Sequence, residues 1–183
     1  GGSTLATTAD NYDEGMINGF EFELRQSLGA WWDPLEGLSL GVNFTLIESE
    51  VDASESEVQD LWDTLIPEIG DIIEAEYDDG KRDMMGAPEY LYNLNATYTV
   101  PKLGTELGLF YTVKGDTLVA AGTQDGGSYI PHIYEKAVGT LNFSISQRVG
   151  RHFNVAFKAK NLLDPDIETV YRSNYTGEEA MKE

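Results

Sequence analysis

Residues 90–100, "YLYNLNATYTV", alternate strictly between two kinds of side chain. Tyr90, Tyr92, Leu94, Ala96 and Tyr98 fall on one side of an extended chain, and Asn93, Asn95, Thr97 and Thr99 fall on the other. A period of two residues is typical of a β-strand with one polar face and one apolar face. The segment is therefore predicted to be a strand that meets water on one side only.

The same alternation recurs in five further segments. They are residues 17–28, 38–49, 106–115, 140–149 and 152–161. In residues 152–161, for example, Phe153, Val155 and Phe157 share one side, and Lys158 and Lys160 lie on the other. Six segments of this kind predict an all-β protein with antiparallel strands that are wet on one face.

The connections between these segments alternate in length. Short turns at residues 29–37, 101–104 and 150–151 alternate with long connections at residues 50–84 and 116–138. Short turns at one end and long loops at the other are typical of a transmembrane β-barrel, whose turns are periplasmic and whose loops are extracellular. We expect residues 1–14 to be an extracellular loop, residues 15–166 the strands and their connections, and residues 167–183 a final extracellular loop that is truncated.

The length of the opening strand fits a membrane. Ten steps from Tyr90 to Val100 span about 33 Å at ~3.3 Å per residue. A strand tilted by ~40° then rises about 25 Å, which is the height of the apolar band on such barrels. Aromatic rings favour the membrane interfaces, so we predict a lipid-facing girdle of Trp31, Trp32, Tyr90, Tyr92, Tyr98 and Tyr111. The alternative is a soluble β-sandwich, a ligand- or carbohydrate-binding module, in which a second sheet covers this apolar face.

The opposite face is polar, and in a wide barrel it would line the lumen. The lumen-lining candidates are Glu21, Glu23, Asn43, Asn93, Asn95, Lys158 and Lys160. In a soluble fold the same residues would simply face solvent.

The formal net charge of −20 argues against binding to nucleic acid, which requires Lys and Arg to neutralise phosphates. Thirteen acidic residues fall within residues 50–83, against only Lys81 and Arg82. Apolar residues at roughly helical spacing in residues 58–79 predict a short helix in this acidic loop, either a structural lid or a gate that contacts a ligand. The candidates for recognition are Asp60, Trp62, Asp63, Glu68 and Asp71. Carboxylates also suit Ca²⁺, so bound calcium is one possibility here; no other cofactor is expected, and no spacing singles out a metal site.

Catalytic chemistry has little support in this sequence. The two histidines, His132 and His152, have no Ser–Asp pair at a triad's spacing, and the chain has no cysteine. Glu21 and Glu23 could act as an acid and a base, but lumen lining explains them more simply. No catalytic residue is predicted, and an outer-membrane enzyme would depend on residues that this sequence does not contain.

The chain resembles the C-terminal part of the barrel of TonB-dependent outer-membrane receptors. The resemblance rests on "GFEFELRQSL", "GLSLGVNFTLIESEV", "GKRDMMGAPEYLYNLNATYTV", "LFYTVKGDTLVAAG" and "PHIYEKAVGTLNFSISQRVGRHFNVAFKAKNLLDP", in that order along the chain. One departure is Ala87, where members often carry Gln before Pro-Glu-Tyr.

The resemblance implies a 22-stranded, plugged barrel of the outer membrane of a Gram-negative cell, of which this chain would supply six strands and lack the plug and the last strand. It also implies active uptake of a scarce solute such as an iron chelate, cobalamin or an oligosaccharide. The partners would be outer-membrane lipid and lipopolysaccharide, the solute, and TonB acting through the plug domain.

Overall fold

The computed structural model describes residues 14–53, 81–100, 102–125, 128–173 and 179–181. Within these ranges the chain is built from strands, with two 3₁₀ turns, η1 (Leu28–Ala30) and η2 (Asp33–Leu35). No helix in this described part is long and apolar enough to cross a membrane.

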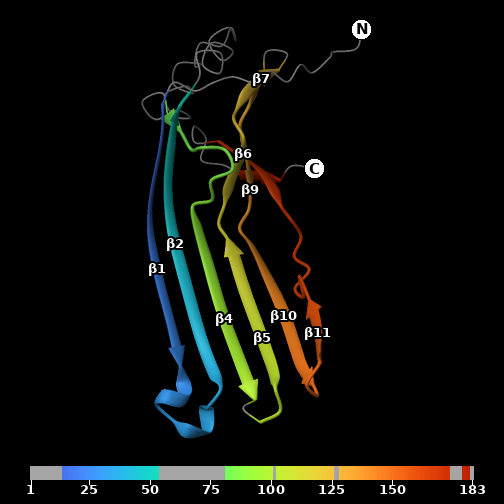
Figure 1. The fold of residues 1–183 in the computed structure, drawn as a ribbon. Helices are drawn as coiled ribbons and strands as arrows, with labels where there is room; N and C mark the ends of the chain where they lie inside the picture. The colour runs from blue at the N-terminus through green and yellow to red at the C-terminus, as the bar shows by residue number, and fades with distance from the viewer. Residues whose placement is uncertain (1–13, 54–80, 101, 126–127, 174–178, 182–183) are drawn as a thin grey trace.

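Six long antiparallel strands form the main sheet, and they lie side by side in chain order (Figure 1). They are β1 (Gly15–Ser27), β2 (Leu38–Asp52), β4 (Tyr90–Val100), β5 (Thr105–Lys114), β10 (Val138–Val149) and β11 (Phe153–Ala159). A short strand, β3 (Lys81–Arg82), pairs with the end of β2. The predicted all-β architecture with antiparallel strands is confirmed, and each predicted strand overlaps one of these six.

The register joins the apolar positions of neighbouring strands into one continuous face. One row of partners runs through Leu24, Val42, Leu94, Tyr111 and Leu141. Residues directly opposite each other in paired strands share a face of the sheet. The alternation within each strand therefore gives the whole sheet one apolar face and one polar face.

No described element covers this apolar face. Leu94 is 48% exposed and Phe157 is 61% exposed. The rings of Phe44 and Tyr92 stack on each other at 4.8 Å between centroids, and Tyr92 is still 37% exposed. A soluble sandwich would bury these side chains against a second sheet, and among the described residues no such sheet lies over them.

A second, four-stranded sheet lies beyond the ends of the long strands, at the end where the long connections are found (Figure 1). It is made of β6 (Thr117–Ala120), β9 (His132–Glu135), β12 (Thr169–Arg172) and β13 (Glu179–Met181), and we call it the upper sheet. A separate hairpin pairs β7 (Thr123–Asp125) with β8 (Ser128–Ile130).

The upper sheet continues the wall of the main sheet. Strand β6 directly follows β5, and β9 directly precedes β10. Leu118, Tyr134 and Val170 are buried together on it. The sequence pattern predicts loops in these segments, so their strands are a difference from that prediction. The helix expected within residues 58–79 lies outside the described residues.

The turn between β1 and β2 depends on a glycine. Gly37 has φ +89°, and a Cβ added there would lie 2.1 Å from the carbonyl oxygen of Thr99. Gly37 also accepts a hydrogen bond from the Thr99 N–H at 2.9 Å. The turn therefore needs both the left-handed conformation and the missing side chain.

We expect Gly37→Ala to destabilise the sheet more than Gly86→Ala. Both glycines have positive φ, so each substitution costs about 1–2 kcal/mol of backbone strain. Gly86 has nothing within 4 Å of the added Cβ, whereas at Gly37 the new atom collides with backbone. Urea unfolding in detergent micelles measures the difference, and equal losses would show that the close contact at Thr99 is unimportant.

Candidate functional site

A line of hydrogen-bonded polar side chains crosses four strands on the face opposite the apolar one. Asn43 donates to Glu21 at 2.6 Å, Asn93 donates to Asn43 at 3.4 Å, and Thr112 donates to Asn93 at 2.9 Å. We call Glu21, Asn43, Asn93 and Thr112 the polar ladder. Each amide donates to one neighbour and accepts from the other, so the four side chains fix one another's orientation.

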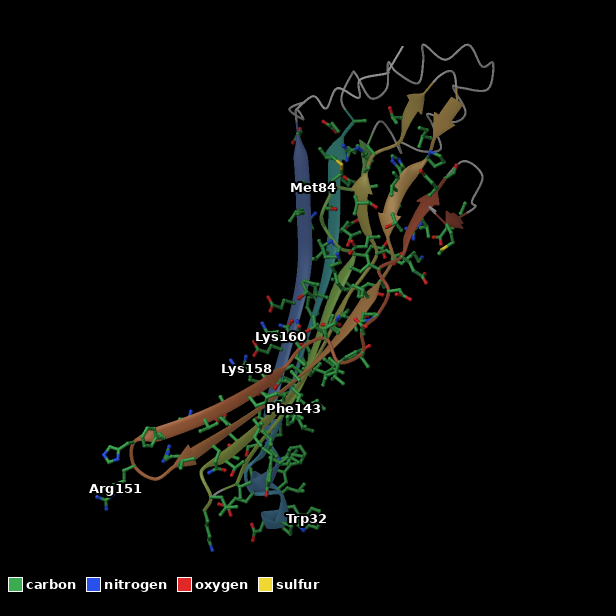
Figure 2. All side chains as sticks on the ribbon, turned by 90° about the vertical axis from the view of Figure 1, so that its right-hand side faces the viewer. Trp32, Met84, Phe143, Arg151, Lys158 and Lys160 are labelled. Carbon is green, nitrogen blue, oxygen red and sulfur yellow. The ribbon has the colours of Figure 1, made fainter. Side chains whose placement is uncertain are left out.

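The remaining lumen candidates lie on the same face of the sheet. Glu23 forms an ion pair with Arg25, and the Asn95 amide lies against Gly41. Lys158 is opposite Ser144, and Lys160 follows the last residue of β11. Figure 2 shows the two lysines projecting from the same side of the sheet. The structure thus places these residues together, while their position in a lumen stays a prediction.

The polar face has a hollow beside the polar ladder, across β1, β2 and β4. A hollow of about 340 Å³ is lined by Glu23, Arg25, Val42, Asn43, Asn93 and Asn95. Its lining offers both hydrogen-bond donors and acceptors, together with one positive and one negative group. Such a surface can hold water or a polar partner, but it has no arrangement of a nucleophile and a base.

An ionic cluster lies at the base of the upper sheet, and Arg172 is at its centre. Arg172 bonds to Asp116, donates from Nε to Glu179 at 2.7 Å, and lies 3.9 Å from Glu89. Its guanidinium also lies 4.2 Å from the centre of the Tyr134 ring. We use the name ionic cluster for Glu89, Asp116, Lys136, Arg172 and Glu179.

Lys136 is the second cation of the ionic cluster. Its Nζ donates to Asp116 at 3.0 Å and to Glu179 at 3.2 Å, and the backbone N–H of Ala137 donates to Asp116 at 2.8 Å. Burial opposes ionisation of Asp116, but these donors and Arg172 outweigh it and lower the pKa of the carboxyl. Hydrogen bonds from Arg172 and Lys136 lower the pKa of Glu179 in the same way.

The segment between β3 and β4 packs against the same cluster. Tyr134 donates its hydroxyl proton to Asp83 at 3.1 Å. Burial, followed by the charge of Asp83, raises the pKa of Tyr134, so the phenol stays protonated at neutral pH. Burial and the nearby Asp116 raise the pKa of Glu89. The cluster therefore ties together segments that are far apart in the sequence.

We expect acid to loosen the upper sheet. The pKa values of Asp116 and Glu179 are lowered on folding, so their stabilisation is complete above the unfolded carboxyl pKa of about 4 and is lost as pH falls through the folded values. The raised pKa of Glu89 acts in the opposite direction and offsets part of this loss. Hydrogen exchange should show that β9 and β12 lose protection below about pH 4, while β4 and β5 keep theirs. Equal protection of the two sheets across this pH range would contradict this prediction.

The ionic cluster is not among the sites predicted from the sequence. One signal was present: Asp116 lies just after the fourth predicted strand and Lys136 just before the fifth, so antiparallel pairing brings them to one level. Arg172 and Glu179 lie in segments that had no visible strand pattern. Among the described residues, no group of three or more His, Asp or Glu side chains could hold a metal ion.

The other predicted residues are the aromatic girdle candidates, which the structure describes, and the loop candidates, which lie outside the described residues. Trp31 and Trp32 are 78% and 62% exposed, and Figure 2 shows Trp32 at the lower end of the sheet, opposite the upper sheet. Tyr90, Tyr92, Tyr98 and Tyr111 lie on the apolar face, as the register requires. The loop candidates Asp60, Trp62, Asp63, Glu68 and Asp71, and with them the calcium prediction, lie outside the described residues.

Comparison with known protein families decides what kind of sheet this is. The family model described as TonB dependent receptor-like, beta-barrel, matches residues 1–162. The chain belongs to the TonB-dependent receptor family. No curated protein and no solved structure matched it.

Membership agrees with the all-β, antiparallel architecture of this TonB-dependent receptor domain. It supports a receptor-type role in transport across the outer membrane, and the family consists of transporters rather than enzymes. TonB and a small solute are partners of the family in general. The resemblance noted in the sequence is therefore confirmed.

Proposed function

We propose that this chain forms six neighbouring strands in the wall of a closed, plugged barrel of the 22-stranded type, and that the barrel takes up a scarce solute. In this proposal the apolar face contacts outer-membrane hydrocarbon and the polar ladder faces the lumen. The upper sheet and the long connections stand outside the cell, and the short turns are periplasmic. The observation that carries it is the continuity of the two faces across all six strands in a chain of this family.

The limits of the apolar face support a membrane position. Phe20, Leu46 and Tyr90 form its uppermost row, and directly above it Asn18 pairs with Glu48 on the same side of the sheet. An apolar band that ends abruptly in polar residues is the pattern of a barrel at a membrane interface.

The edges of the main sheet support closure into a larger barrel. In the described part of the chain, β1 and β11 each pair with a neighbour on one side only. Unpaired backbone groups in hydrocarbon cost several kcal/mol each, so spanning sheets have no open edges. Further strands beside β1 and β11 are required, and the family's barrel supplies them.

The solute belongs to the classes that the resemblance implies: an iron chelate, cobalamin or an oligosaccharide. Recognition is assigned to the long connections, with Asp60, Trp62, Asp63, Glu68 and Asp71 as the first residues to test. Calcium bound by the acidic loop is part of this proposal, as is energy from TonB transmitted by a plug domain.

The test uses the whole receptor in cells with and without TonB. Radiolabelled ferric chelates, cobalamin and oligosaccharides are supplied in turn, and one class should accumulate only when TonB is present. Replacing residues 58–79 with a Gly-Ser linker should abolish binding of that solute and leave the amount of receptor in the outer membrane unchanged. A receptor that reaches the outer membrane yet shows no TonB-dependent uptake of any class would contradict the proposal.

A further inference from the structure

The apolar face carries a hollow near the short-turn end of the sheet. It measures about 610 Å³ and extends across β1, β2, β4 and β5. Its lining is almost entirely apolar: Leu24, Leu28, Trp31, Leu40, Leu94 and Leu109 supply most of it. We call it the Trp31 hollow.

The hollow has two structural causes. The first is a small residue among large ones: Ala96 lies between its partners Leu40 and Leu109 in the middle of the row. The second is the fold of the β1–β2 connection. The N–H groups of Trp31 and Trp32 both donate to the carbonyl of Leu28 at 3.1 Å, which closes a tight turn and brings the Trp31 side chain to the hollow's end.

We propose that the Trp31 hollow binds one acyl chain of a phospholipid that carries an amine headgroup. The inference rests on the proposed contact of this face with hydrocarbon. The lining has few polar groups on this face: the Gln26 amide, which already donates to the carbonyl of Ser27 at 2.8 Å, the Tyr111 hydroxyl and the Trp31 indole N–H. A peptide in the hollow would bring backbone N–H and C=O groups with few partners, which is costly. An acyl chain brings none.

The charge of the adjoining turn selects the headgroup. Residues 28–37 contain Asp33 and Glu36 and no Lys or Arg, and both carboxylates are exposed; the β4–β5 turn at the same end of the sheet adds one cation, Lys102, so the two carboxylates still outnumber it. A Trp at the interface also marks the level at which headgroups lie. An ammonium group is attracted to this turn, whereas an anionic headgroup is repelled. The geometry therefore favours phosphatidylethanolamine over phosphatidylglycerol.

The experiment counts lipids retained by the whole receptor. The receptor is purified from vesicles containing equal amounts of phosphatidylethanolamine and phosphatidylglycerol, and native mass spectrometry identifies the lipids that stay bound. Wild type should retain one phosphatidylethanolamine. Ala96→Leu fills the hollow and should lose it. Ala159→Leu is the matched control, because Ala159 lies in the same row of the same face, outside the hollow, and it should retain the lipid.

The headgroup is tested with Asp33→Asn combined with Glu36→Gln. This variant should still retain one lipid but should take the two phospholipids equally. Retention of phosphatidylethanolamine by Ala96→Leu at the wild-type level, or its loss from Ala159→Leu as well, would overturn the inference. A receptor that transports its solute but binds no phospholipid would also overturn it while leaving the proposed function intact. Absence of the receptor from the outer membrane would instead count against the proposed function.

Discussion

Leu94→Arg should destabilise the receptor in a lipid bilayer by about 2–4 kcal/mol. Leu94 lies near the middle of β4 and is 48% exposed on the apolar face. An arginine on the lipid face of a barrel costs this amount at the bilayer midplane and much less near the interfaces. The cost arises because the guanidinium loses water and finds no partner in hydrocarbon. Urea unfolding in vesicles of defined lipid measures it.

Thr97→Arg is the matched control for this substitution. Thr97 lies on the same strand, three residues away, and faces the opposite side of the sheet. In an aqueous lumen the new charge stays hydrated, so the free energy of unfolding should change by less than about 1 kcal/mol. Equal losses at the two positions would show that both faces meet the same environment.

Arg172→Ala should open the upper sheet without unfolding the main sheet. The substitution removes the ion pairs to Asp116 and Glu179 and the contact with Tyr134. It leaves Asp116, whose side chain is only 14% exposed, with Lys136 as its single cation. Removing one partner of a buried pair costs about 3–5 kcal/mol. Arg172 is partly exposed, so we expect about 2–3 kcal/mol, seen as faster hydrogen exchange in β9 and β12.

Lys81→Ala provides the comparison for Arg172→Ala. Lys81 pairs with Glu50 at 3.2 Å, and both side chains are well exposed, so removing this pair should leave hydrogen exchange nearly unchanged. If Arg172→Ala had as little effect as Lys81→Ala, the ionic cluster would not be what holds the upper sheet together. Loss of protection in β4 and β5 as well would contradict the separation of the two sheets.

The main sheet could be predicted from the sequence because each strand carries its own signal. Tyr90 to Val100 alternates without a break, and the short turns at residues 101–104 and 150–151 leave no choice but antiparallel neighbours. The lengths of the connections then separated the two ends of the sheet. The same alternation placed Asn43 and Asn93 on the face opposite Phe44 and Tyr92, but it showed neither the hydrogen bonds of the polar ladder nor the part of Thr112 in it.

The upper sheet could not be predicted because its strands are too short for a period to be visible. Strands β6, β9 and β12 have four residues each and β13 has three. Their stability comes instead from pairs that are distant in the sequence, such as Arg172 with Asp116. The Trp31 hollow was also hidden, since it depends on how Ala96, Leu40 and Leu109 align across three strands, which is a matter of register.

Site-directed labelling tests most directly the claim that one face meets lipid and the other meets water. This chain has no cysteine, so once any cysteines elsewhere in the receptor are replaced by serine, single substitutions here give unambiguous attachment points. Leu94→Cys and Leu109→Cys sample the apolar face, and Asn93→Cys and Thr112→Cys sample the polar ladder on the same two strands. In the whole receptor in vesicles, fluorophores at the first pair should be quenched by nitroxides on lipid acyl chains, and the second pair should react instead with a charged maleimide in water. Labels at all four positions that respond alike to the lipid quencher would contradict the account.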